Sequence, residues 1–190
     1  MRIKTLKALR ALRRQGGDEY GRAVTFFTKG TNSEVLFREE FQHLLPEGLA
    51  IVKASHYTEC DKEFGNPNRP AKSPTDYVMI YKSTVIAAIE VTTGVPGYSY
   101  ASSRRLPTSE EKLERMDRYL GCYVVMLVLL GEPRFIWALS SDIRTFKAEL
   151  DNDGELMHWS SPKIWKHELN GLADALVKLA EHVDELVKAA

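Results

Sequence analysis

The pattern of hydrophobic and polar positions is most informative between residues 74 and 92. Residues 77–81 are apolar, aromatic and β-branched, residues 85–91 are almost continuously apolar, and the polar tripeptide 82–84 separates them. Two such runs joined by a short polar segment predict a β-hairpin. Because both runs are apolar on each face, we expect them to be central strands of a sheet that is covered on both sides.

Other apolar runs predict the rest of the sheet. Residues 49–54, 122–130 and 134–139 each predict a strand, and the run at 122–130 is typical of a fully buried one. Residues 24–27 predict a short strand or an extended lead-in. Cys122 opens a buried run, so we expect a buried thiol there, and its distance from Cys60 matches no zinc or redox spacing.

Helical periodicity occupies the remaining regular segments. It predicts helices over residues 2–14, 34–45, 109–120, 143–150 and 166–189. We expect Thr108 or Ser109 to cap the third of these helices. The length of 190 residues and the hydrophobic content of 44% fit a single domain. We divide it into a basic N-terminal helix (1–15), a core (22–145) and a C-terminal helix (163–190).

Two carboxylates interrupt the apolar pattern of the hairpin. Asp76 opens its first strand and Glu90 stands near the end of its second. The start of one hairpin strand lies beside the end of the other, so we expect the two side chains to be neighbours at one end of the sheet. A carboxylate in an apolar strand is costly unless it is paired or binds a metal. Two adjacent carboxylates repel each other, and a divalent cation is a common remedy.

Charge is distributed locally rather than globally. The formal net charge is zero at pH 7, so the whole chain gives no basic signal for nucleic acid. The predicted helix at 2–14, however, is basic without acidic residues and includes Arg10, Arg13 and Arg14. A solvated face of a packing helix and a nucleic-acid contact both explain it.

Two long polar segments flank the hairpin, at 55–73 and 93–105. Long loops in compact domains are often functional. Basic and aromatic side chains beside an acidic site suit contacts to phosphate and sugar. The candidates are Lys72, Tyr98, Tyr100, Arg104 and Arg105. The sequence shows neither a signal-peptide pattern nor an apolar run of membrane-spanning length, so we expect a soluble, cytoplasmic protein without a membrane partner.

The order of predicted elements and the position of the acidic residues resemble the PD-(D/E)xK nuclease superfamily. Residues Pro74-Thr75-Asp76 stand for the PD element with one residue inserted, and Ile89-Glu90-Val91-Thr92 stand for the (D/E)xK element. Residues 29–34, which end in Glu34, look like the glycine-rich segment and helix glutamate of Holliday-junction resolvases. The resemblance implies an α/β fold with a restriction-endonuclease-like αβββαβ core, in which helices flank a central mixed sheet.

One position departs from the family pattern. Thr92 stands where the motif has a lysine, which would help to position the attacking water and stabilise charge at the phosphate. Lys112, on the following helix, is the best migrated candidate, and Lys53 and Lys72 are weaker ones. Lys82 is excluded because it lies at the far tip of the hairpin, several residues of about 3.3 Å each from the carboxylates.

The resemblance implies a metal-dependent endonuclease that hydrolyses DNA phosphodiester bonds, of restriction, repair or junction-resolving type. Asp76, Glu90 and the Val91 carbonyl would bind Mg²⁺ or Mn²⁺, and Glu34 would hold a second ion or a metal-bound water. A homodimer would cut two strands. Two other hypotheses remain. In one, the nuclease fold serves an inactive subunit that binds nucleic acid or a partner. In the other, the protein is a scaffold whose carboxylates make only structural hydrogen bonds.

Overall fold

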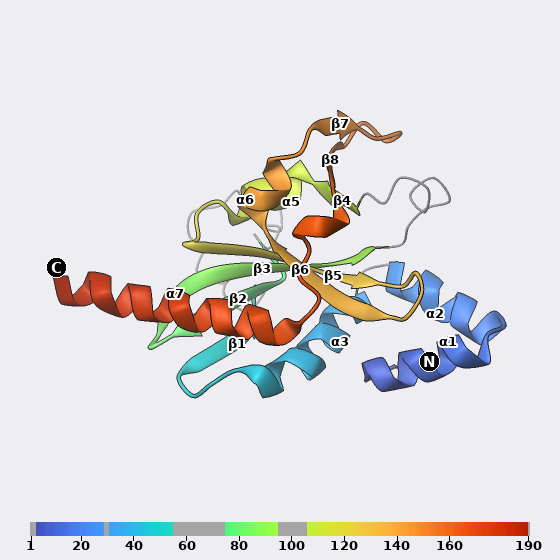
Figure 1. The fold of residues 1–190 in the computed structure, drawn as a ribbon, viewed down its shortest axis with the longest axis horizontal. Helices are drawn as coiled ribbons and strands as arrows, with labels where there is room; N and C mark the ends of the chain where they lie inside the picture. The colour runs from blue at the N-terminus through green and yellow to red at the C-terminus, as the bar shows by residue number, and fades with distance from the viewer. Residues whose placement is uncertain (1–2, 29–30, 55–74, 95–105, 190) are drawn as a thin grey trace, which may run out of the picture.

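The structure is a computed structural model that describes residues 3–28, 31–54, 75–94 and 106–189 (Figure 1). The helices and strands of these residues are α1 (Leu6–Gln15), α2 (Asp18–Thr28), α3 (Thr31–Phe41), η1 (Gln42–Leu44), β1 (Leu49–Lys53), β2 (Tyr77–Tyr81), β3 (Thr84–Gly94), β4 (Leu106–Ser109), α5 (Glu110–Met116), β5 (Gly121–Val128), β6 (Arg134–Leu139), α6 (Ser140–Arg144), β7 (Ala148–Leu150), β8 (Leu156–Ser160), η4 (Pro162–Ile164) and α7 (Leu169–Ala189).

A five-stranded mixed sheet forms the centre of the molecule. Its strand order is β1-β2-β3-β5-β6. Strands β1, β2 and β3 pair antiparallel, β3 pairs parallel with β5, and β5 pairs antiparallel with β6. The predicted αβββαβ order is therefore confirmed by α3, β1, β2, β3, α5 and β5. The prediction of an α/β fold with a central mixed sheet flanked by helices is likewise confirmed.

Helices cover the two faces of this sheet unequally. One face, with Ile89 and Val125, packs against α1, α2, α3 and α7 in the larger core. The other face, with Ala88 and Val124, packs against α5 and α6 in a smaller core. In Figure 1, α5 and α6 lie above the sheet and α3 lies below it. Strands buried on both faces explain why their sequences are nearly continuous runs of apolar residues.

The turn of the predicted hairpin consists of Lys82 and Ser83. Both have positive φ, 46° and 67° respectively, which a tight two-residue hairpin turn requires. Strand β3 is longer than predicted and continues to Gly94, well past the level at which β2 begins.

A second, three-stranded sheet was not predicted from the sequence. Its order is β4-β8-β7, and all its pairs are antiparallel. The helix predicted over 143–150 is wrong, because α6 spans Ser140–Arg144 and the chain then enters β7. The turn after β7 is shaped by Asp151, whose carboxylate accepts hydrogen bonds from the backbone N–H groups of Asp153 (2.9 Å) and Glu155 (2.8 Å).

The N-terminal region is more helical than expected. Residues 24–27 are not a strand but part of α2, in which Ala23 and Phe27, four residues apart, are buried on one stripe. The boundary proposed at residue 22 therefore falls inside α2. Helix α1 begins at Leu6, because the Thr5 hydroxyl caps it by accepting a hydrogen bond from the Ala8 N–H at 3.2 Å. Helix α3 also begins earlier than predicted, at Thr31, and ends at Phe41.

The region from Ser109 to Cys122 differs from the predictions in several details. Helix α5 ends at Met116, and Leu120, which was expected to face inward, is 64% exposed. Ser109 occupies the N-cap position of α5 without a side-chain capping hydrogen bond. Cys122 is only partly buried.

The C-terminal helix begins at Leu169 rather than at residue 163, because the chain just before it pairs with the edge of the central sheet. Lys166 forms a β-bridge with Trp137 of β6, with N···O distances of 2.9 and 2.8 Å. No helix in the described part of the chain is long and apolar enough to cross a bilayer.

Candidate active site

The two carboxylates of the hairpin lie side by side. Tyr77 pairs with Ile89, so the residues next to them, Asp76 and Glu90, face each other at the end of β2. Side chains alternate along a strand, which puts both carboxylates on the sheet face that α5 covers. The Asp76 Oδ2 atom accepts a hydrogen bond from the Val91 N–H at 2.8 Å.

The site forms at the end of the sheet where β2 begins. There β3 extends beyond its pairing with β2, although it remains paired with β5. Past Ile89, the backbone of β3 loses its partner in β2, and side chains replace it. The Thr75 hydroxyl donates to the Ile89 carbonyl at 2.8 Å, and the Val91 N–H donates to Asp76. The N–H and C=O groups of one strand residue point to the same side of the strand. The Val91 carbonyl therefore lies on the side of β3 that faces Asp76.

Asp76 has a strongly perturbed acidity. Burial is the largest cause that raises the pKa of this carboxyl to about 7, and the negative charges of Glu90 and Glu34 raise it further. The hydrogen bond from Val91 and the charge of Lys112 act in the opposite direction without compensating. An added cation would stabilise the ionised form of this carboxyl group.

Glu90 is almost fully buried, at 4% exposure, and it meets two cations from α5. The Lys112 Nζ atom lies 3.1 Å from Glu90 Oε1, and an Nη atom of Arg115 lies 3.8 Å from the same oxygen. Lys112 and Arg115 are three residues apart, so they project from one side of the helix. The candidate preferred from sequence, Lys112, is thus next to Glu90. Arg115 was missed, although its helical spacing from Lys112 was a usable signal.

The other lysine candidates lie elsewhere. Thr92, two residues after Glu90 on β3, is on the same sheet face as the carboxylate and is partly buried. Lys53 pairs with Glu34, at 3.1 Å between Nζ and Oε2. Lys82 pairs with Asp184 of α7 at 3.0 Å, far from the carboxylates as expected. Lys72 lies outside the described residues.

Glu34 approaches the site from the opposite face of the sheet. Its helix α3 packs on the larger core, and the Tyr77 hydroxyl donates to the Glu34 carbonyl at 3.0 Å. The Glu34 charge reaches Asp76, since it contributes to the raised pKa of that group. Among the described residues, however, no three His, Cys, Asp or Glu side chains are gathered to hold a metal ion.

The donor set nevertheless suits a hard divalent cation. Asp76, Glu90 and the Val91 carbonyl offer only oxygen atoms, which Mg²⁺ and Mn²⁺ prefer. Burial, and after it the negative charges of Glu90 and Glu34, raise the pKa of Asp76, and a bound cation would counteract these effects. Glu34 does not complete this group, because its carboxylate pairs with Lys53.

Comparison with solved structures finds a likeness of fold. No protein-family model and no curated protein matches the sequence. The fold is similar to that of Hjc, a Holliday junction resolvase from Archaeoglobus fulgidus, with a TM-score of 0.43 and 13% sequence identity, over 77% of this chain and 98% of that chain.

The arginines of α1 that were predicted to contact nucleic acid have partners within the chain. Arg10 donates to the Pro133 carbonyl at 3.1 Å and pairs with Glu132 at 3.4 Å. Arg14 pairs with the same Glu132 at 3.6 Å. Arg13 lies over the ring of Tyr20, 5.5 Å from its centroid. The other predicted contacts, Tyr98, Tyr100, Arg104 and Arg105, lie outside the described residues.

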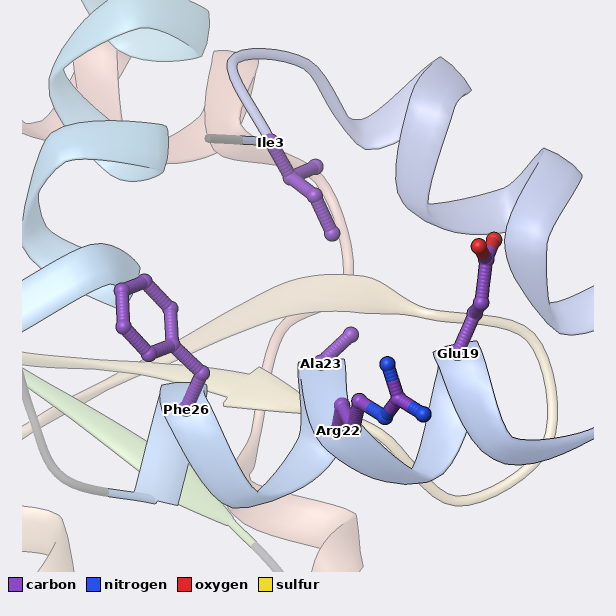
Figure 2. A pocket seen from close by; sticks show the side chains of 5 residues that line it. All are labelled: Ile3, Glu19, Arg22, Ala23 and Phe26. Atoms are coloured by element: carbon purple, nitrogen blue, oxygen red, sulfur yellow. The ribbon is translucent and has the colours of Figure 1, made fainter. Parts of the chain in front are cut away.

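A cavity of about 310 Å³ lies between the N-terminal segment and α2 (Figure 2). Ile3 and Ala23 point into it from opposite sides, and Phe26, which is 48% exposed, closes one end. The charged residues Glu19 and Arg22 stand along its rim. Its lining includes no residue of the carboxylate site.

Proposed function

We propose that this protein is a metal-dependent endonuclease that hydrolyses DNA phosphodiester bonds, with Mg²⁺ or Mn²⁺ as its cofactor. The observation that carries the proposal is the 3.1 Å contact between Lys112 Nζ and Glu90, next to Asp76. This contact brings an ammonium group to the acidic pair from α5, although the strand position itself holds Thr92. Two carboxylates, a backbone carbonyl and a lysine form a chemically coherent group for phosphodiester hydrolysis.

Each residue has a definite role in this proposal. Asp76, Glu90 and the Val91 carbonyl would hold the cation, and Glu34 would contribute through its charge. When bound, the cation would activate a water molecule and neutralise charge that develops on the phosphate. Lys112 supplies a positive charge where a phosphate oxygen would become more negative. The Thr92 hydroxyl can orient a water molecule by a hydrogen bond but carries no charge.

The proposal is tested by incubating the protein with linear, circular, single-stranded and branched DNA, with Mg²⁺, with Mn²⁺ and with EDTA. We expect cleavage that requires the metal. Asp76→Asn, Glu90→Gln and Lys112→Ala should each reduce the rate about 100-fold or more, since each removes a group that stabilises the transition state. Lys147→Ala is the matched control, because the Lys147 side chain is 84% exposed.

Far-ultraviolet circular dichroism should show that the variants remain folded. Unchanged cleavage by both Asp76→Asn and Glu90→Gln would overturn the proposal, and so would equal cleavage in EDTA. The same cleavage assays with RNA substrates decide whether the protein distinguishes ribose from deoxyribose.

A second candidate is a binding protein that uses the same site without cleavage. It is favoured by the uncharged Thr92 and by the ion pairs that already occupy Glu34 and Glu90. It predicts nucleic-acid binding without any cleavage in Mg²⁺ or Mn²⁺. Titration calorimetry separates both candidates from a plain scaffold, which would bind no divalent cation.

A further inference from the structure

Of the two described cations that α5 brings to the site, Arg115 uses less of its hydrogen-bonding capacity than Lys112 does. Its side chain is 28% exposed, and its nearest Nη atom is 3.8 Å from Glu90 Oε1. That distance is too long for a hydrogen bond. In the part of the chain that the structure describes, its Nε–H is buried without a hydrogen-bond partner. Buried donors are satisfied in the great majority of cases, so an orphan donor beside an acidic pair needs an explanation.

Glu90 does not explain the unpaired donor of Arg115. Its single negative charge already has a closer partner in Lys112, at 3.1 Å. The Glu90 carboxylate therefore attracts Arg115 electrostatically but accepts no hydrogen bond from it. A guanidinium group presents five N–H donors in a rigid fork, and this fork matches two oxygens of a phosphate group. The position of Arg115 thus fits a ligand that bears phosphate oxygens.

We propose that Arg115 binds a backbone phosphate of the nucleic acid at the carboxylate site, while Lys112 serves Glu90 and the reacting phosphate. This inference rests on the proposed function and assigns a different role to each of the two cations of α5. An ammonium is a compact point charge, whereas the fork of Arg115 fixes orientation through paired hydrogen bonds. Arg115 is therefore assigned to substrate binding and Lys112 to the chemical step.

A structural role for Arg115 makes a different prediction. If Arg115 only balanced the charge of Glu90, its replacement would change stability and cleavage without changing the number of ions released on nucleic-acid binding. The salt dependence of binding measures that number, because each neutralised phosphate releases counterions. The dissociation constant as a function of salt concentration thus separates the two roles.

The experiment measures binding of fluorescently labelled DNA and RNA, single-stranded and duplex, by anisotropy in EDTA over a range of salt concentrations. Arg115→Ala should weaken binding about tenfold or more and lower the slope of log K against log salt by about one. Arg115→Lys should keep the slope but recover only part of the affinity. Arg118→Ala is the matched control, since Arg118 is exposed and lies over the Tyr119 ring, 5.3 Å from its centroid.

The outcomes are distinguishable. Binding and salt slope of Arg115→Ala equal to those of Arg118→Ala, in a protein that cleaves nucleic acid, would overturn the role of Arg115 and leave the proposed function intact. A wild-type protein that neither binds nor cleaves nucleic acid would overturn both. Should Arg115→Ala fail to fold, Arg115→Lys decides, because affinity equal to wild type would exclude a paired hydrogen bond to phosphate.

Discussion

The pKa of Asp76 reflects its burial and the charges around it. Asp76 is buried near Glu90 and Glu34, and among the described residues a hydrogen bond from the Val91 N–H and the charge of Lys112 favour its ionised form. These surroundings raise its pKa to about 7. In the folded protein, the side chain therefore changes its charge close to neutral pH. Groups with strongly shifted pKa values concentrate at functional sites, where the arrangement needed for activity lowers the stability of the fold.

The first prediction concerns the stability of Asp76→Asn as a function of pH. The unfolded chain has an aspartate pKa of about 3.9, so between about pH 4 and pH 7 the folded wild type binds more protons and loses stability as pH rises. Asparagine does not titrate and can still accept the Val91 N–H bond. The variant should be more stable than wild type at pH 8, by on the order of a few kcal/mol, and lose that advantage at pH 4. Urea unfolding at both pH values measures it.

Added Mg²⁺ provides the control for this prediction. A cation that stabilises the Asp76 carboxylate should narrow the difference between wild type and Asp76→Asn at pH 8. A difference in the free energy of unfolding that is the same at pH 4 and pH 8 would contradict the raised pKa.

The sequence predicts only part of the site at this scale. Asp76 and Glu90 stand out because a carboxylate inside an apolar strand demands a partner, and pairing at one hairpin end follows from strand geometry. The bond between Asp76 and the Val91 N–H depends on where β2 begins, which propensity does not define to one residue. The pairing of Glu34 with Lys53 joins two distant elements and has no local signal.

At the scale of elements, α5 holds the cations of the site through a network at its own N-terminus. Glu110, its first residue, accepts a hydrogen bond from Arg144 Nε at 3.1 Å and contacts the His158 ring through Nε2. The His158 Nδ1 atom lies 2.9 Å from the Phe146 carbonyl, so that nitrogen donates. The network ties α5 to α6 and β8. A helix of only seven residues has little stability of its own and depends on such tertiary contacts.

The second prediction is that Glu110→Ala destabilises the fold by about 1–3 kcal/mol, because it leaves the buried His158 nitrogen without its partner. Cleavage should also fall, since the helix that carries Lys112 and Arg115 is less firmly held. Chemical denaturation measures the first effect and the rate of cleavage the second. Glu114→Ala, on the exposed side of α5, serves as the control. Equal stability of the two variants would show that the network does not hold α5.

Prediction from sequence succeeded for elements with a strong apolar pattern. Strands β1, β2 and β6 were found nearly to the residue, because buried strands have dense β-branched and aromatic runs. The sheet of β4, β8 and β7 was missed because its strands are short and partly exposed, with Leu150 70% exposed. Residues 24–27 were predicted to be a short strand or an extended lead-in, because their β-branched and aromatic composition hides the helical spacing of Ala23 and Phe27.

The whole molecule depends on its last helix for the larger core. Leu172 and Leu176 of α7 are completely buried, and they pack into the same cluster as Leu9 and Phe37 near the start of the chain. Further along α7, Leu186 and Val187 are 51% and 70% exposed. The helix thus closes the core with one half and presents apolar residues to solvent with the other. The predicted homodimer stays a prediction, and this exposed end is where its contact would be sought.

The third prediction compares two leucines of α7. Leu176→Ala should lower the free energy of unfolding by about 2–5 kcal/mol, because it creates a cavity in a closed core. Leu186→Ala should change it by no more than about 0.5 kcal/mol. Urea unfolding of both variants at low protein concentration tests this. A marked loss for Leu186→Ala that grows with protein concentration would instead reveal a dimer stabilised through α7.

The bridge between Trp137 and Lys166 has a consequence for how the chain is made. An uncovered edge strand offers unpaired backbone groups to any other strand. During synthesis, β6 leaves the ribosome well before Lys166, and the core that needs Leu172 and Leu176 comes later still. Between these moments, the nascent sheet has a bare edge and an open face. Translation pauses after β6 would therefore lengthen the period in which chaperones must shield the chain from aggregation.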